Sequence, residues 1–173
     1  KFQGYGNNYD FIYMAIRRPD GLVGKPAEVG TDVFAMDTGN NSSAGPAFDS
    51  NFAVDFALLQ QPASSGLDWR SFARLTGTKS LATNTTAAEV TESYNTSDYN
   101  DGFTYGYSNI WQSWMWKRHA GFDVVAYEGE GGTSYFSHNL GKTPEMIWVK
   151  RRNTTENWIV YHKGLNGGSS PED

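Results

Sequence analysis

Aromatic and basic side chains occur together in two runs of this chain. Trp114–Arg118 reads Trp-Met-Trp-Lys-Arg, and Ile147–Arg152 reads Ile-Trp-Val-Lys-Arg-Arg. Indole rings stack on the apolar faces of sugars, while charged and amide groups bond the hydroxyls around them. This combination predicts a glycan-binding surface. The candidate ligand-binding residues are Trp111, Trp114, Trp116, Trp148, Trp158, Arg118 and Arg151.

The same residues also have a purely structural interpretation. Alternate residues of a strand face opposite sides of a sheet, so these runs would place aliphatic side chains on one face and Arg, Lys and Trp on the other. Long cationic side chains often cover their neighbours on a solvated face, and Trp is often largely buried in a β core. The sequence leaves both interpretations open.

Two clusters of acidic and amide residues are candidates for a calcium site. Calcium binds about six to eight oxygen atoms, often supplied by loops of this composition. Neither cluster has the spacing of an EF-hand, and Asp and Asn are also ordinary turn residues. The candidate ligands are Asp32, Asp37 and Asn40 in the first cluster, and Asp98, Asn100 and Asp101 in the second.

The residues that catalysis would need are not arranged in a recognisable way. Glycoside hydrolysis uses two carboxylates that face each other across a cleft, whereas Glu128 and Glu130 lie in a Gly-rich turn. His119, His138 and His162 do not have metal-binding spacing, and the chain contains neither a Gly-x-Ser-x-Gly elbow nor a phosphate loop. We therefore expect a protein that is not an enzyme and that needs no cofactor, calcium apart.

Composition narrows the classes of partner. The 173 residues include 14 Lys plus Arg and 19 Asp plus Glu. This mildly acidic balance disfavours a nucleic-acid partner, because phosphate binding needs a basic face. Cysteine is absent, which excludes disulfides and thiolate metal sites. No apolar run reaches the roughly 20 residues that span a bilayer, so we expect no membrane insertion.

Short strands separated by turn residues account for most of the chain. The aromatic content of 15% and the 19 glycines are typical of β proteins. The stretch 76–100 is rich in Thr, Asn and Ser, and we expect no long helix there, although 86–91 could form one helical turn. Together the pattern predicts an all-β, antiparallel β-sandwich. The predicted strands are 9–18, 32–37, 52–59, 68–73, 103–107, 110–118, 122–127, 135–138, 144–151 and 157–162.

One sequence pattern occurs twice at an offset of about 90 residues. Asp32–Gly39 is echoed by Asp123–Gly129, and Asp55–Leu59 is echoed by Glu145–Val149. Asp68–Phe72 is echoed by 157–161 in the same order. The repeat predicts a duplicated module of about 90–100 residues, and repeated modules usually build extended or multivalent objects.

The order of several motifs resembles a family of repeat modules in virion proteins of marine tailed phages, especially cyanophages. The resemblance implies a concanavalin A-like or jelly-roll β-sandwich used in tail fibres or other surface proteins, and it implies no catalytic residues. The motifs are Trp69–Glu89 (WRSFARLTGTKSLATNTTAAE), Asp101–Phe103, Trp114–Val124 (WMWKRHAGFDV), Tyr127–Gly129, His138–Gly141, Pro144–Arg152, Trp158–His162 (WIVYH) and, at the end of a module, Tyr13–Arg18.

The frame of that family divides the chain into three parts. Residues 1–31 would hold the closing strand of one module and a loop, 32–118 a complete module, and 119–173 the opening half of another. A strand with an unpaired edge is a template for further pairing. We therefore hypothesise that 122–162 and the strand at 9–18 complete one sandwich, either within the chain or between copies.

These expectations combine into one functional hypothesis. The resemblance implies a structural or adhesion module at the surface of a phage particle, with host cell-surface glycan recognition as its task. The alternative is a purely architectural capsid-decoration or tail subunit, whose partners are other virion proteins or copies of itself. A third interpretation is a polysaccharide depolymerase.

Overall fold

The structure is a computed structural model that describes residues 10–16, 29–42, 44–64, 66–106, 109–118 and 121–168. Within these ranges the chain forms thirteen β-strands and no α-helix, and the paired strands are antiparallel. The predicted antiparallel β class is therefore confirmed. No helix in this part is long and apolar enough to cross a membrane. Three 3₁₀ turns accompany the strands: η1 (Gly30–Asp32), η2 (Arg74–Thr76) and η3 (Leu165–Gly168).

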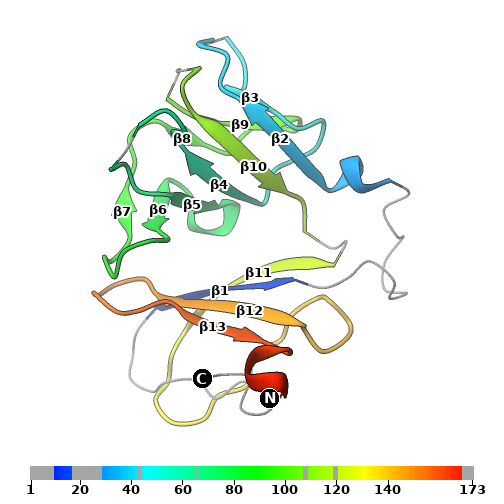
Figure 1. The fold of residues 1–173 in the computed structure, drawn as a ribbon, viewed down its shortest axis with the longest axis vertical. Helices are drawn as coiled ribbons and strands as arrows, with labels where there is room; N and C mark the ends of the chain where they lie inside the picture. Colours follow the sequence, from blue (N-terminus) through cyan, green and yellow to red (C-terminus); the bar gives the residue numbers. More distant parts are fainter. Residues whose placement is uncertain are drawn as a thin grey trace.

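Six strands form the largest sheet, in the upper half of Figure 1. Strands that are distant in the sequence pair here, since β10 lies between β2 and β4. Neighbouring strands are antiparallel throughout. The order across the sheet is β2 (Phe34–Thr38), β10 (Gln112–Trp116), β4 (Phe56–Gln60), β5 (Arg70–Ala73), β6 (Lys79–Ala82) and β7 (Val90–Thr91).

A second sheet has four strands and lies below the first in Figure 1. Its order is β11 (Phe122–Glu128), β1 (Asp10–Ile16), β12 (Met146–Arg151) and β13 (Ile159–His162). The strand β1 therefore pairs with β11 on one side and with β12 on the other. This pairing between the predicted strand at 9–18 and the segment 122–162 occurs within one chain. The division into modules at 32 and 119 stays a prediction.

A small third sheet covers one face of the six-stranded sheet. Its order is β3 (Phe48–Asp49), β9 (Gly102–Tyr105) and β8 (Asn95–Thr96). The rings of Phe48 and Phe103 stack at 5.1 Å in this sheet. They form the first apolar cluster together with Ala57, Leu59, Phe72 and Met115 of the larger sheet. Strand alternation explains the set, because these four residues share one face of their sheet.

A second apolar cluster joins the six-stranded and four-stranded sheets. Phe56, Ala73 and Leu81 contribute from the larger sheet, and Ile12, Phe122 and Val124 from the smaller one. The ring of Trp116 stacks on Phe122 at 5.8 Å, and Trp148 and Trp158 pack against the same cluster. Because residues from both sheets are buried here, the contact between the sheets is itself a hydrophobic core.

The segment between β6 and β7 also binds the hairpin formed by β12 and β13. The indole Nε1 of Trp158 donates to the carbonyl of Ala82 at 2.9 Å, and the Glu156 amide donates to the carbonyl of Thr86 at 2.9 Å. The buried ammonium of Lys150 donates to the same Thr86 carbonyl at 3.2 Å. Burial lowers the pKa of Lys150, with Glu156 acting in the opposite direction. Polar bonds thus reinforce the apolar contact.

The other face of the four-stranded sheet carries a third, smaller cluster. Leu140 and Val149 are buried in it, and Tyr127 and Phe136 stack at 3.7 Å beside them. Burial raises the pKa of Tyr127 to about 12. The segment around Phe136 was predicted as a strand at 135–138, but its backbone is irregular. Phe136 packs its ring against the third cluster, and the segment forms no strand.

Several boundaries differ from the sequence-based prediction. The strand predicted at 52–59 begins at Phe56, because 51–55 forms bends and a loop. The stretch 76–100, in which no strand was predicted, contains β6, β7 and β8, and 86–91 does not form a helical turn. The strands β7 and β8 have two residues each, so neither is long enough to show an apolar alternation.

Candidate functional site

Four of the five predicted ligand-binding tryptophans pack against the apolar clusters. Trp111 lies edge-on to Tyr105, with ring centres 5.3 Å apart, against the first cluster. Trp116 contacts the rings of Phe34, Phe56 and Phe122. Trp148 and Trp158 meet at right angles, 6.4 Å apart, beside the second cluster. These four side chains are partly buried, and the structural interpretation accounts for their positions.

The two predicted ligand-binding arginines are paired with carboxylates of the chain. The Nε of Arg118 lies 3.2 Å from the buried carboxylate of Asp123, and NH1 of Arg151 lies 3.4 Å from Glu156. Asp123 also accepts the amide of Asn139 at 2.7 Å. A buried carboxylate needs such partners to offset its lost hydration. Arg118 therefore acts in the contact between the sheets.

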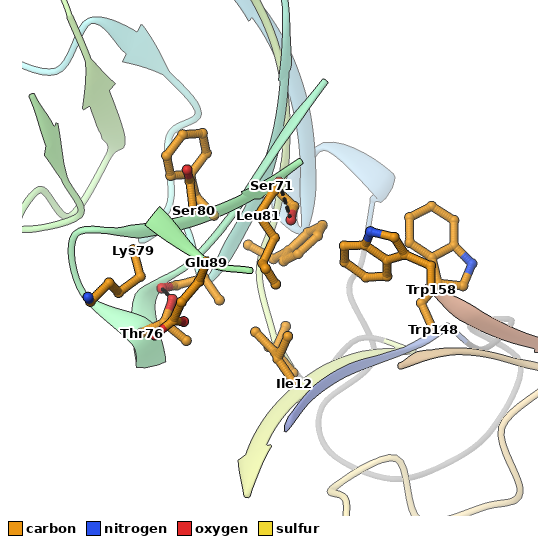
Figure 2. Close-up of a pocket in the computed structure, with 13 residues that line it drawn as sticks. Ile12, Ser71, Thr76, Lys79, Ser80, Leu81, Glu89, Trp148 and Trp158 are labelled. Atoms are coloured by element: carbon orange, nitrogen blue, oxygen red, sulfur yellow. Dashed lines mark hydrogen bonds between the residues drawn. The ribbon is translucent and has the colours of Figure 1, made fainter. Parts of the chain in front are cut away.

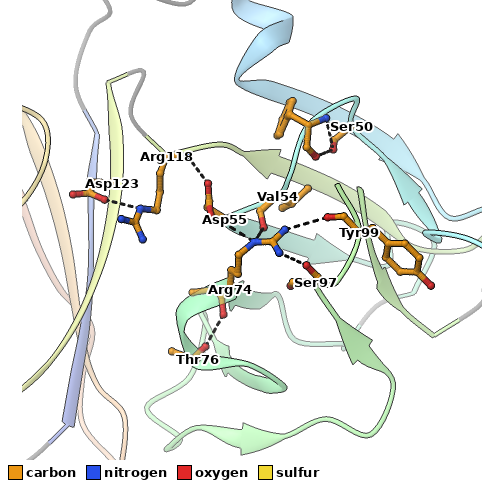
Figure 3. Close-up of polar contacts among 11 residues, drawn as sticks. Ser50, Val54, Asp55, Arg74, Thr76, Ser97, Tyr99, Arg118 and Asp123 are labelled. Carbon is orange, nitrogen blue, oxygen red and sulfur yellow. Dashed lines mark hydrogen bonds and ion pairs between the residues drawn. The ribbon is translucent and has the colours of Figure 1, made fainter. Parts of the chain in front are cut away.

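Figure 3 shows the rest of this polar network. The Arg118 amide donates to the carboxylate of Asp55 at 2.9 Å, and Arg74 lies 3.6 Å from the same carboxylate. The guanidinium of Arg74 also donates to three backbone carbonyls, those of Val54, Ser97 and Tyr99. Arg74 is thus held by several acceptors within the chain, whereas the Arg118 guanidinium pairs with Asp123. The network ties the loop before β4 to η2, β8 and the four-stranded sheet.

The fifth predicted ligand-binding tryptophan, Trp114, stacks on another tryptophan. It occupies the middle of β10, opposite Met36 on β2 and Leu58 on β4. Its ring stacks on that of Trp69, with ring centres 5.0 Å apart and planes 19° apart. Trp69 directly precedes β5, and β4 lies between β5 and β10. The two rings therefore meet above an intervening strand.

We call the surface formed by Met36, Leu58, Trp69 and Trp114 the aromatic face. It lies on the same side of the six-stranded sheet as Trp116 and Phe56, since these positions are two residues apart on β10 and β4. The four-stranded sheet covers the end with Trp116 and Phe56. The other end remains accessible, because Met36 is 61% exposed and both stacked tryptophans are partly exposed.

Neutral polar groups continue the aromatic face along the strands. Gln112 stands opposite Thr38 and Gln60, and the Thr38 hydroxyl donates to Gln112 Oε1 at 3.0 Å. Asp68, one residue out of phase with Trp69, instead pairs with Arg70 at 3.9 Å and accepts the side-chain amide of Asn84 at 3.1 Å. An aromatic surface with amides and a hydroxyl at its rim is thus present on the molecule.

A family described as a domain of unknown function, DUF7483, matches residues 34–171. The chain belongs to the DUF7483 family. No curated protein and no solved structure matches it. The DUF7483 region includes β2 to β13, and with them the strands of the aromatic face, and it begins after β1.

The calcium candidates of this DUF7483 chain lie in a strand, turns and loops, and several of them bond the backbone. Asp32 and Asp37 accept the backbone amides of Val29 and Asp49, at 3.4 and 2.8 Å. Asn40 bonds the Pro46 carbonyl and the Ser42 amide. Asp98 and Asn100 are exposed, and the backbone carbonyl of Asp101 accepts two amides. Across the residues that the structure describes, no three His, Cys, Asp or Glu side chains gather as a metal site would need.

A small pocket lies between the two larger sheets, and Figure 2 shows its lining. Ile12, Leu81, Trp148 and Trp158 contribute apolar walls, and Glu89 stands at its rim. The pocket encloses about 20 Å³, which is the space of about one water molecule. It is a gap in the contact between the sheets and has no room for a sugar.

Sequence reasoning missed Trp69 as a candidate. No basic cluster follows it, and Trp69 was interpreted as part of a strand at 68–73, of the repeat and of the family motif, but not as a ligand-binding residue. The alternation itself was a usable signal, since it places Trp69, Ser71 and Ala73 on one face. What the sequence could not indicate is that β4 separates β5 from β10 and brings Trp69 to Trp114.

Proposed function

We propose that this chain is a non-enzymatic structural and adhesion module at the surface of a phage virion, and that its aromatic face recognises a host cell-surface glycan. The observation that carries the glycan proposal is the stacked Trp69–Trp114 pair beside the exposed Met36. The placement on a phage particle rests on the motif resemblance described for the sequence.

The chemistry of the aromatic face supports sugar contact. Each stacked indole has one ring face against its partner, so its other face and its edge are what a ligand can reach. Sugars present apolar C–H faces to such rings and hydroxyls to polar neighbours. The pair is also held in place by its own stacking, which reduces the entropy lost on binding. A single site of this kind would bind a sugar weakly. Many copies on one particle would bind the host surface more tightly through avidity.

A concanavalin A-like or jelly-roll sandwich is the finer architecture that we propose. Support comes from two antiparallel sheets that share a buried apolar cluster, as packed sheets do in sandwiches. On this proposal, the duplicated sequence pattern reflects related halves. A solved structure in which these two sheets do not pack face to face would contradict it.

An architectural subunit is the alternative, and one observation favours it. Met36 is 61% exposed on β2, which is the last strand at one side of the six-stranded sheet. Exposed methionine is more typical of protein interfaces than of sugar sites. On this alternative, another virion protein or a second copy would cover the aromatic face.

A glycan array with purified variants tests the proposal. We expect saturable binding by the wild-type chain, and binding of Trp69→Ala weakened by about tenfold or more through loss of ring contact. Tyr94→Ala is the matched control, because it removes a 69% exposed aromatic ring away from the aromatic face. Absence of saturable binding would favour the architectural alternative, and release of reducing sugar would indicate a depolymerase.

A further inference from the structure

The two larger sheets contain the same arrangement of four strands. The order β2-β10-β4-β5 in the six-stranded sheet recurs as β11-β1-β12-β13 in the four-stranded sheet, antiparallel throughout. The three segments of the sequence repeat fall on β2, β4 and β5 in its first copy, and on β11, β12 and β13 in its second. The strand β1 therefore occupies the place in its sheet that β10 occupies in the other.

The pairing registers agree with this correspondence. Counted along the repeat, β4 pairs with β5 in the same register in which β12 pairs with β13. Leu58 of β4 stands opposite Trp114 of β10, and the equivalent Trp148 of β12 stands opposite Met14 of β1. In the sequence, Lys-Arg follows β10 directly and Arg-Arg follows β1 directly. Thus β1 and β10 are equivalent strands in position and in register.

The two equivalent strands differ in their place along the chain. β10 follows β2, β4 and β5, and it is connected to β9 on one side and to β11 on the other. β1 instead precedes β11, β12 and β13, and the whole six-stranded sheet lies between them in the sequence. The DUF7483 region accordingly contains β11 and β12 but not the strand that separates them. The four-stranded sheet takes an inner strand from outside the family region.

This inner strand bonds along both of its edges. All residues of Asp10–Ile16 have partners on β11, and Phe11–Ile16 also have partners on β12. The side chain of Ile12 is 7% exposed and belongs to the second apolar cluster. Without β1, the facing edges of β11 and β12 would present unpaired backbone groups to each other. The place between them requires a strand, and β1 of any copy would make the same contacts.

We propose that β1 is exchanged between copies of this chain, so that β1 of one copy pairs between β11 and β12 of a second copy. The closed chain and the exchanged dimer contain the same strand pairs, which makes exchange of an identical element a low-cost route to association. Copies that are held close together favour the exchanged form through their effective concentration. This interlock goes beyond the proposed glycan recognition and does not depend on it.

Engineered cysteines test the exchange, because the sequence contains none. Ala15 of β1 and Ile147 of β12 are register partners, and opposite residues of antiparallel strands lie close enough for a disulfide. One full-length chain carries Ala15→Cys, and a second, tagged chain carries Ile147→Cys. The two are unfolded together, refolded at high concentration and oxidised. We expect a disulfide-linked heterodimer whose yield rises with protein concentration.

A pair of register partners on β2 and β10 supplies the matched control. Thr38 is exposed and Gln112 is partly exposed, and they stand opposite each other. Thr38→Cys and Gln112→Cys in separate chains should give severalfold less heterodimer, because both strands lie within the same unexchanged sheet. A single chain that carries both cysteines of either pair should form its internal disulfide, which verifies the fold and the register of each pair.

The outcomes concern the exchange alone. A severalfold excess of the Ala15–Ile147 heterodimer over the control would support it. A yield equal to that of the control at every concentration would overturn it and leave glycan recognition standing. A dimer without the disulfide would also overturn it, since the copies would then meet through another surface.

Discussion

Glu89 and Arg152 bond each other twice across the contact between the two larger sheets. The carboxylate of Glu89 accepts Arg152 Nε at 2.7 Å, and the Glu89 amide donates to the Arg152 carbonyl at 2.8 Å. Their side chains are only 16% and 17% exposed. Glu89 immediately precedes β7, and Arg152 immediately follows β12. These two hydrogen bonds therefore fix the segment between β6 and β7 onto the β12–β13 hairpin.

Removing one member of this pair should destabilise the fold. Arg152→Ala leaves the Glu89 carboxylate partly buried without its cation, so we expect a loss of about 1–2 kcal/mol in the free energy of unfolding. Chemical denaturation measures the change. Lys163→Ala is the control, since the Lys163–Glu145 pair is more exposed, at 54% and 32%, and should contribute less than about 1 kcal/mol. Equal losses in the two variants would contradict the structural role of Arg152.

Gly102 sits where the backbone of β3 approaches β9 too closely for a side chain. A Cβ atom at this position would lie 2.1 Å from the carbonyl oxygen of Phe48 and 2.8 Å from Cβ of Pro46. Gly102→Ala should therefore displace β3 and lower the free energy of unfolding by about 1–3 kcal/mol. Gly45→Ala, where a Cβ meets nothing within 4 Å, should change it by less than about 0.5 kcal/mol. A denaturation midpoint for Gly102→Ala at the wild-type value would contradict the close approach.

The stacked pair on the aromatic face should show energetic coupling. We expect a double-mutant cycle of Trp69→Ala and Trp114→Ala to give about 0.5–1.5 kcal/mol, because offset stacking adds to the area that each ring buries. Chemical denaturation of the two single variants and the double variant supplies the value. A cycle of Trp69→Ala with Trp111→Ala should give less, since Trp111 packs on Tyr105 instead. Additive effects within Trp69–Trp114 would show that the rings do not contact in solution.

The class of fold was predictable from local patterns. Strands such as Gln112–Trp116 alternate in burial along their length, as period-2 sequences do. The same pattern correctly places Trp114 and Trp116 on one face. It cannot say that the four-stranded sheet covers Trp116 and leaves Trp114 partly exposed, because that depends on how far a second sheet extends.

The candidate site depended on long-range pairing that the sequence does not encode locally. Trp69 reaches Trp114 only because β4 pairs with both β5 and β10. The predicted role of Arg118 and Arg151 in ligand binding likewise relied on their being accessible. Their ion-pair partners, Asp123 and Glu156, could be identified only once the strands were placed.

The raised pKa of Tyr127 predicts a loss of stability at high pH. Its phenol has a pKa of about 12 in the folded state, whereas in an unfolded chain it has its ordinary pKa of 10.0. The folded state thus binds more protons between these values, so this contribution to stability falls as the pH rises from 10 towards 12. Tyr127→Phe should flatten that fall in pH-dependent denaturation, and it should remove an ultraviolet phenolate step near 12. An unchanged slope would contradict the burial of this hydroxyl.

The most direct test of glycan recognition uses the six tryptophans as internal reporters. Each indole N–H gives its own resonance in a two-dimensional nitrogen–proton spectrum, and an oligosaccharide chosen from the array is titrated in. We predict that the Trp69 and Trp114 resonances shift in a saturable way, while those of Trp111, Trp116, Trp148 and Trp158 do not. Saturable shifts confined to these four, or no shift in any resonance at saturating sugar, would contradict the account.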